Sequence, residues 1–163
     1  MTAALSGPVQ ADIATGFSVR PIPKIPLATA AELRVSDGFG RTEIRPSAFA
    51  FTQVPPIELP LDMRGEVYAQ AGYVGGDFAT PFADGQARID RPVVATKAVT
   101  LHAGVGTWGG AQKGAARLDA GPSLRADISV ADIPIRVSVD YRARVAGDAA
   151  PPSGVALTVS TGF

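Results

Sequence analysis

Apolar and polar residues alternate strictly along residues 133–145, and this alternation constrains the fold more than any other feature of the sequence. Successive side chains of a β-strand point to opposite faces of a sheet, so the pattern predicts a strand with one apolar face and one ionic face. The apolar face would hold Ile133, Ile135, Val137, Val139, Tyr141, Ala143 and Val145, and the polar face Arg136, Ser138, Asp140, Arg142 and Arg144.

The same alternation recurs along most of the chain, in segments separated by glycine and proline. It is clear in residues 9–19, 27–35, 63–73, 99–105, 116–128 and 155–163, and weaker in residues 42–54 and 82–91. Within residues 82–91, a polar face would be shared by Asp84, Gln86, Arg88 and Asp90. The sequence therefore predicts an all-β, antiparallel up-and-down fold of about nine strands, each of about 9–12 residues.

The connections between these segments alternate in kind. Proline-marked turns are predicted at residues 20–26 and 55–60, near Pro92 and near Pro134; glycine-marked loops are predicted at residues 37–40, 75–85, 109–114 and 147–154. Every second connection of an up-and-down sheet lies at the same end of the strands. One end of the sheet should therefore carry the proline-type turns and the other end the glycine-type loops.

Two architectures fit the alternation: a transmembrane β-barrel and a soluble β-sandwich. The polar faces hold mixed Arg, Asp, Ser, Gln and Gly, as a polar barrel interior would, and aromatic residues make up only 7% of the chain, fewer than a sandwich core of this size usually needs. No run of 18 apolar residues could cross a membrane as a helix, although 46% of the residues are hydrophobic. We favour the transmembrane barrel and keep the sandwich as the alternative.

The length and the termini bear on domain organisation. Residues 1–163 are enough for one β-barrel domain, or for the C-terminal fragment of a larger barrel. The first residues lack the pattern of a secretory signal peptide, and about nine strands is an odd number, whereas bacterial single-chain barrels have even numbers. We therefore expect further strands upstream. By barrel convention the C-terminus is periplasmic, which makes the glycine-type loops extracellular.

The polar face carries the candidate functional residues. They are Arg117, Arg125, Arg136, Arg142, Arg144 and His102, and all are predicted to line the interior. One hypothesis is that the arginines line a path for anionic polysaccharide or set the selectivity of a pore. The other, which we favour, is that they pair with Asp119, Asp127 and Asp140 and hold the interior together, because opposite charges on neighbouring strands commonly do so.

The sequence offers no catalytic, metal or cofactor site. His102 is the single histidine and there is no cysteine, so a shared imidazole or thiolate metal site has too few ligands, and His102 is expected to make interior hydrogen bonds. The 15 basic and 15 acidic residues give a net charge of zero, which offers nothing to nucleic acid. We expect Trp108 to be an interface anchor or loop residue rather than a platform for sugar. We therefore predict a protein that is not an enzyme.

Two segments carry a resemblance to known proteins. The C-terminal Gly154-Val-Ala-Leu-Thr-Val-Ser-Thr-Gly-Phe163 resembles the closing strand that the barrel-assembly machinery of the outer membrane reads, with Val155, Leu157, Val159 and Phe163 as its signal, although Thr161 stands where that signal often has an aromatic residue. Residues 71–90 and 106–122 look like the C-terminal barrel of the bacteriophage adsorption protein A family and of related tetratricopeptide-plus-barrel proteins that export exopolysaccharide. The resemblance covers roughly the last hundred residues.

This resemblance implies a location in the bacterial outer membrane and a set of partners: outer-membrane lipid, the barrel-assembly machinery, and polysaccharide or phage at the extracellular loops. Two functions follow from it, a passage for glycan or solutes and a surface receptor. The sequence leaves open the choice between them, because the pore diameter depends on the total number of strands.

Overall fold

The chain forms a single antiparallel β-sheet in the computed structural model, which describes residues 11–38, 41–76, 79–130 and 133–161. This part of the chain contains ten strands and no helix. The strands are β1 (Ala11–Val19), β2 (Leu27–Gly38), β3 (Arg41–Thr52), β4 (Ile57–Leu59), β5 (Met63–Val74), β6 (Thr80–Ala95), β7 (Val99–Gln112), β8 (Ala115–Val130), β9 (Ile133–Gly147) and β10 (Gly154–Thr161). The all-β antiparallel prediction is confirmed.

The strands follow one another in the sheet in the order β1-β2-β3-β5-β6-β7-β8-β9-β10, so each strand except the short β4 pairs with the next long strand in the sequence. These nine strands correspond to the nine predicted segments, and the weakly alternating segments prove to be the full-length strands β3 and β6. The short β4 was not predicted and pairs only with β5, inside the connection that the sequence marked as a proline turn.

The connections lie where the alternation of turn types predicted, with three corrections to their bounds. Pro92 lies inside β6, at an irregularity in its pairing with β7, and the turn itself comes at residues 96–98, where the Thr96 hydroxyl donates to the Val99 carbonyl. Gly85, Gly109 and Gly110 lie in strands rather than in loops. The β7–β8 hairpin is therefore tight, with Gly114 in the left-handed region at φ +79.

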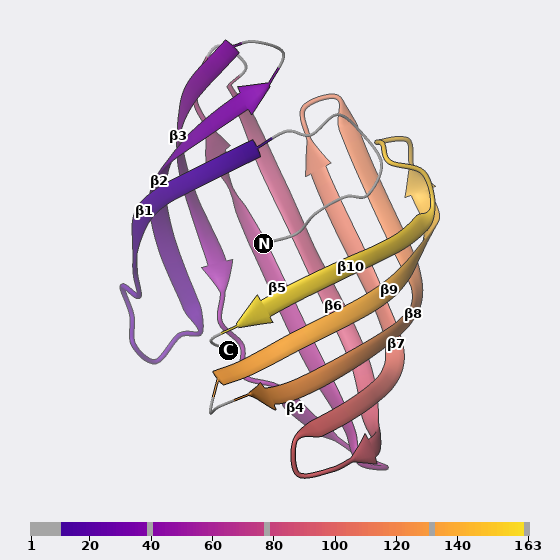
Figure 1. The fold of residues 1–163 in the computed structure, drawn as a ribbon. Helices are drawn as coiled ribbons and strands as arrows, with labels where there is room; N and C mark the ends of the chain where they lie inside the picture. The colour runs from indigo at the N-terminus through magenta and orange to yellow at the C-terminus, as the bar shows by residue number, and fades with distance from the viewer. Residues whose placement is uncertain (1–10, 39–40, 77–78, 131–132, 162–163) are drawn as a thin grey trace.

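The sheet is strongly curled, so that it has a concave and a convex face. In Figure 1, β8, β9 and β10 cross the front of the molecule while β5 and β6 run behind them. Side chains three strands apart touch on the concave side: Arg125 of β8 reaches Glu66 of β5 at 2.9 Å. In a flat sheet, such strands would lie about 14 Å apart, beyond easy reach of the two side chains.

Glycines on the concave face permit this curl. A Cβ added at Gly121 would lie 1.9 Å from the carbonyl oxygen of Tyr141 on the next strand, and one at Gly104 would lie 2.1 Å from the carbonyl oxygen of Ile89. Gly72 faces a similar approach by Ala48. Glycine in a strand commonly marks a site where another backbone comes close, and here the close approaches lie on the side toward which the sheet bends.

We therefore expect Gly121→Ala to reduce the free energy of unfolding by about 1–3 kcal/mol, the usual cost of overpacking. The added methyl meets backbone rather than a flexible side chain, so β8 and β9 must move apart. Urea unfolding followed by the fluorescence of Trp108, the single tryptophan, measures the change.

The matched control is Gly109→Ala, because a Cβ at Gly109 meets nothing closer than a methyl carbon of Leu118 at 3.5 Å. It should leave the stability within about 0.5 kcal/mol of the parent. Equal stabilities for both variants would show that β8 and β9 do not approach each other this closely at Gly121 in solution.

The sheet is not closed into a barrel. In the part of the chain that the structure describes, β1 and β10 are its two edges and do not pair with each other. Every neighbouring pair along the nine-strand path is antiparallel, so the first and the last strand run in the same direction. Direct closure would need a parallel pair, and the prediction of a barrel is met only as far as a curled, open sheet.

Candidate functional site

The two faces of the sheet have an inverted distribution of side chains. Among the described residues, the buried apolar side chains are only Ala28, Val74 and Trp108, whereas eight polar or charged side chains are buried. Large apolar side chains are exposed instead: Val145 is 64% exposed and Val155 72%. The exposed face also carries Val105, Leu124, Val139, Tyr141, Leu157 and Val159. The polar residues of the alternation therefore lie on the concave, more buried face, and the apolar residues lie on the convex, exposed face.

Arg125 lies at the centre of the first group of charges on this face. Its side chain is fully buried, with Nη1 2.9 Å from Glu66 and 3.0 Å from Asp90, and Nε 3.6 Å from Asp127. These three carboxylates come from β5, β6 and β8. The guanidinium therefore ties together strands that are not neighbours, and we call this group, with His102, the Arg125 cluster.

His102 belongs to this cluster. Its Nδ1 lies 3.1 Å from Asp90 and its Nε2 3.6 Å from Asp127. The residue is 8% exposed and sits opposite Arg125 in the β7–β8 register. The expectation that His102 makes interior polar contacts is met by this geometry. No group of three or more potential ligands among the described residues is placed to hold a metal ion.

A second group surrounds Asp140 of β9, whose side chain is completely buried. Arg88 of β6 contacts both of its carboxylate oxygens at 3.1 and 3.2 Å, and the Ser123 hydroxyl donates to it at 2.6 Å. Arg142 lies 3.7 Å away. Because β6 and β9 are three strands apart, this contact also spans the concave face.

Trp108 is not an interface anchor or a loop residue, which corrects that expectation. It lies in β7, 6% exposed on the concave face, with the guanidinium carbon of Arg142 4.7 Å and that of Arg88 5.9 Å from its ring centroid. The ring also covers Gly106, where an added Cβ would lie 2.6 Å from it. The alternation in β7 places Trp108 on the same face as His102, and this was the signal for its position.

The remaining predicted arginines also make contacts on this face. Arg117 donates to Asp119, two residues along the same strand, at 2.8 Å, and Arg136 donates to its cross-strand neighbour Asp127 at 2.8 Å. Arg144 donates to the carbonyls of Ala149 and Pro151 in the loop before β10. The pairing with Asp119, Asp127 and Asp140 that we favoured is thus present in the structure.

Sequence analysis missed several members of these groups. Glu66 was not singled out, because residues 63–73 were assessed only by their apolar face. Asp90 and Arg88 were placed on a polar face without a role. The proposed assembly signal lies partly on the described chain: Val155, Leu157 and Val159 are exposed on the convex face of β10, and Phe163 lies outside the described residues.

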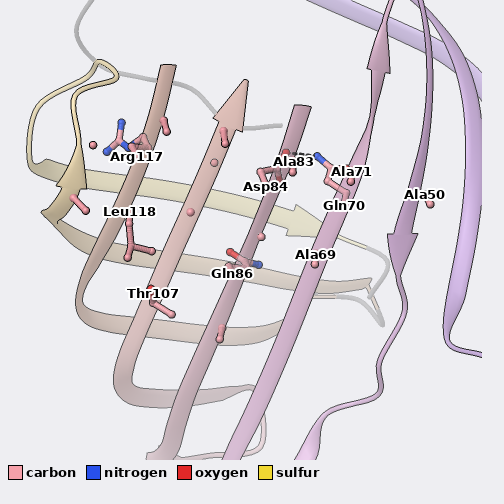
Figure 2. Close-up of a pocket in the computed structure, with 18 of the residues that line it drawn as sticks. Ala50, Ala69, Gln70, Ala71, Ala83, Asp84, Gln86, Thr107, Arg117 and Leu118 are labelled. Carbon is pink, nitrogen blue, oxygen red and sulfur yellow. Dashed lines mark hydrogen bonds between the residues drawn. The ribbon is translucent and has the colours of Figure 1, made fainter. Parts of the chain in front are cut away.

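Two hollows accompany the two faces. A polar cavity of about 770 Å³ lies on the concave face, bordered by β5 and β6 and by residues of β8 and β9. A shallow apolar groove of about 830 Å³ is lined mainly by small residues of β5 to β8, with Ala69, Ala71, Ala83, Thr107 and Leu118 among those shown in Figure 2. Charged side chains line much of the polar cavity, whereas few line the apolar groove.

Comparisons with protein-family models, curated proteins and solved structures found no match to this chain. No helix among the described residues has the length and apolar character needed to cross a membrane.

Proposed function

We propose that this chain forms part of the wall of a β-barrel in the bacterial outer membrane, with its convex face against lipid and its concave face lining the interior, and that it is not an enzyme. The observation that carries the proposal is the inverted distribution of side chains. Large apolar residues exposed along strand after strand would be costly in water and are the rule on the lipid-facing surface of a barrel.

The lengths of the strands support the proposal. A tilted strand needs about 9–11 residues to cross the hydrocarbon core. The long strands β5 to β9 have 12, 16, 14, 16 and 15 residues. The short connections between β6 and β7 and between β7 and β8 also fit an up-and-down barrel, in which long crossovers are absent.

The alternative, a soluble β-sandwich acting as a binding module, would pack two apolar sheet faces against each other. The described part of the chain contains one sheet, and its apolar face is uncovered. This arrangement favours the membrane proposal over the sandwich.

Within the membrane class, we propose a passage rather than a passive scaffold, because the concave face combines a polar cavity with fixed charges of both signs. The resemblance to exopolysaccharide exporters and phage-adsorption proteins motivates export of glycan as the transport activity and a role of the glycine-type loops in adsorption. A pore would appear as conductance steps in a planar bilayer, whereas a receptor with a filled interior would give none.

The membrane proposal predicts a heat-modifiable protein. After refolding in detergent, the unheated chain should migrate on a denaturing gel as a compact, protease-resistant band, and boiling should convert it to a slower band, because the hydrogen-bonded sheet survives the gel detergent until it is heated. The control is the same chain dialysed into buffer without detergent. A folded, monomeric, soluble protein in that buffer would contradict the membrane proposal and restore the sandwich.

A further inference from the structure

Three arginines line the polar cavity, and one of them has no carboxylate partner among the described residues. Arg64, at the start of β5, lines the cavity, and its Nε is buried without a hydrogen-bond partner. None of the ion pairs in the described part of the chain includes Arg64. Of the arginines that line the cavity, Arg64 is therefore the one whose charge no carboxylate of the described residues balances.

The acidic groups nearest to Arg64 in the sheet either pair with other residues or lie beyond ion-pair distance. Asp90, its register partner on β6, lies 3.0 Å from Arg125 and 3.1 Å from His102. Glu66, two residues along β5, lies 2.9 Å from Arg125 and 3.5 Å from Arg136. Glu58 of β4 is the partner on the other side, but it is exposed and does not come within ion-pair distance.

The other charges around the cavity balance one another. Arg88 is held by Asp140, and Arg136 is held by Asp127. The wall near Arg64 also offers neutral groups, the side chains of Gln53, Gln86 and Thr52. An amide or hydroxyl hydrogen can donate to an anion as readily as to water.

We propose that this cavity is a binding site for an anionic group, a carboxylate or a phosphate carried by a small molecule or by a polymer, with Arg64 as its principal ligand. The guanidinium presents a planar fork that matches both oxyanions, and a partly buried cation gains most from a charged acceptor. The cavity volume of about 770 Å³ is that of an ordinary small-molecule site. This inference rests on the proposed function, because it needs an interior open to solutes.

The arginines that the sequence singled out therefore have a different role from that of Arg64. Arg117, Arg125, Arg136, Arg142 and Arg144 are engaged with protein groups and form the frame, whereas Arg64 has its charge available for a ligand. The frame fixes the wall of the cavity through Arg136 and Asp127, and these two residues line it directly.

Equilibrium dialysis of the refolded 163-residue chain against radiolabelled inorganic phosphate, and separately against glucuronate, tests the site at constant ionic strength, with glucose as the neutral probe. We expect the parent to bind an anion and not glucose, and Arg64→Gln to weaken binding about tenfold or more, the loss that follows from removing charged hydrogen bonds. Tighter binding of phosphate than of glucuronate would assign a phosphate-bearing ligand, and the reverse order a uronic acid.

The matched control is Arg91→Gln, which removes an exposed arginine of β6 that lines no part of the cavity. It should bind as the parent does, within about twofold. Equal binding by the two variants, or no anion bound by a parent whose heat-modifiable band shows that it is folded, would overturn the proposal. A chain that folds without detergent would instead contradict the membrane function, and the same dialysis would then be read in buffer.

Discussion

Replacing Arg125 with methionine is expected to lower the free energy of unfolding by about 3–5 kcal/mol, because it leaves the buried carboxylate of Asp90 without its arginine partner. Methionine keeps much of the apolar stem and removes the charge. Asp90 and Glu66, on the neighbouring strands β6 and β5, would then lose the arginine that they share and keep only His102 and Arg136 as partners. Urea unfolding in detergent, followed by Trp108 fluorescence, gives the value.

The control for this change is Lys24→Met, at an exposed position in the connection between β1 and β2, which should stay within about 0.5 kcal/mol of the parent. A double variant with Asp90→Asn adds a second check. If the two residues interact directly, its cost should be smaller than the sum of the single costs by about 0.5–3 kcal/mol. A loss below about 1 kcal/mol for Arg125→Met, the usual value of an exposed ion pair, would show that water screens the cluster.

The faces of the strands were predictable from the sequence, and the contacts across the interior were not. Whether a residue holds an odd or an even position along a strand decides the face of the sheet on which its side chain lies. The alternation in β9 therefore correctly placed Asp140 and Arg142 on one face and Val139 and Tyr141 on the other. The position of a residue along its own strand does not reveal which side chains of distant strands it contacts. The Arg88–Asp140 pair joins strands three apart and depends on how tightly the sheet curls.

The curl depends on where glycine permits a close approach of two backbones, and this is visible only once the register is known. Gly121 and Gly104 were ordinary strand glycines in the sequence, and the structure places them under the carbonyl oxygens of neighbouring strands. Gly85 and Gly109 were assigned to loops, although they lie in β6 and β7, because glycine marks turns as well as strand interiors. Local composition does not separate these two uses.

Arg64 escaped notice because its strand was recognised by its apolar face alone. Gly65 interrupts the apolar face at the start of β5, and β4 was not recognised within a segment rich in proline. An unpaired charge is a property of three-dimensional neighbours, and no spacing along the chain reveals it.

The second large effect is expected on the opposite face. Leu124 lies near the middle of β8, is 51% exposed, and pairs with Ala103 and Val139 on the strands beside it. If this face meets lipid, arginine at position 124 must be placed close to the bilayer midplane. Leu124→Arg should then cost about 2–4 kcal/mol, whereas the same change at an interface costs about 0–1 kcal/mol.

Ile133 provides that comparison, because it is the first residue of β9, at the end of the strand, and is 57% exposed. The two positions share an apolar parent residue and a similar exposure and differ in depth along the strands. Ile133→Arg should therefore fold in lipid vesicles nearly as well as the parent.

The free energy of unfolding of Leu124→Arg in lipid vesicles, measured beside that of Ile133→Arg, tests most directly whether the convex face lies against lipid. We expect the first variant to lose about 2–4 kcal/mol and the second no more than about 1 kcal/mol. Equal and small losses for both, within about 0.5 kcal/mol of the parent as for surface positions in water, would contradict a lipid-facing sheet.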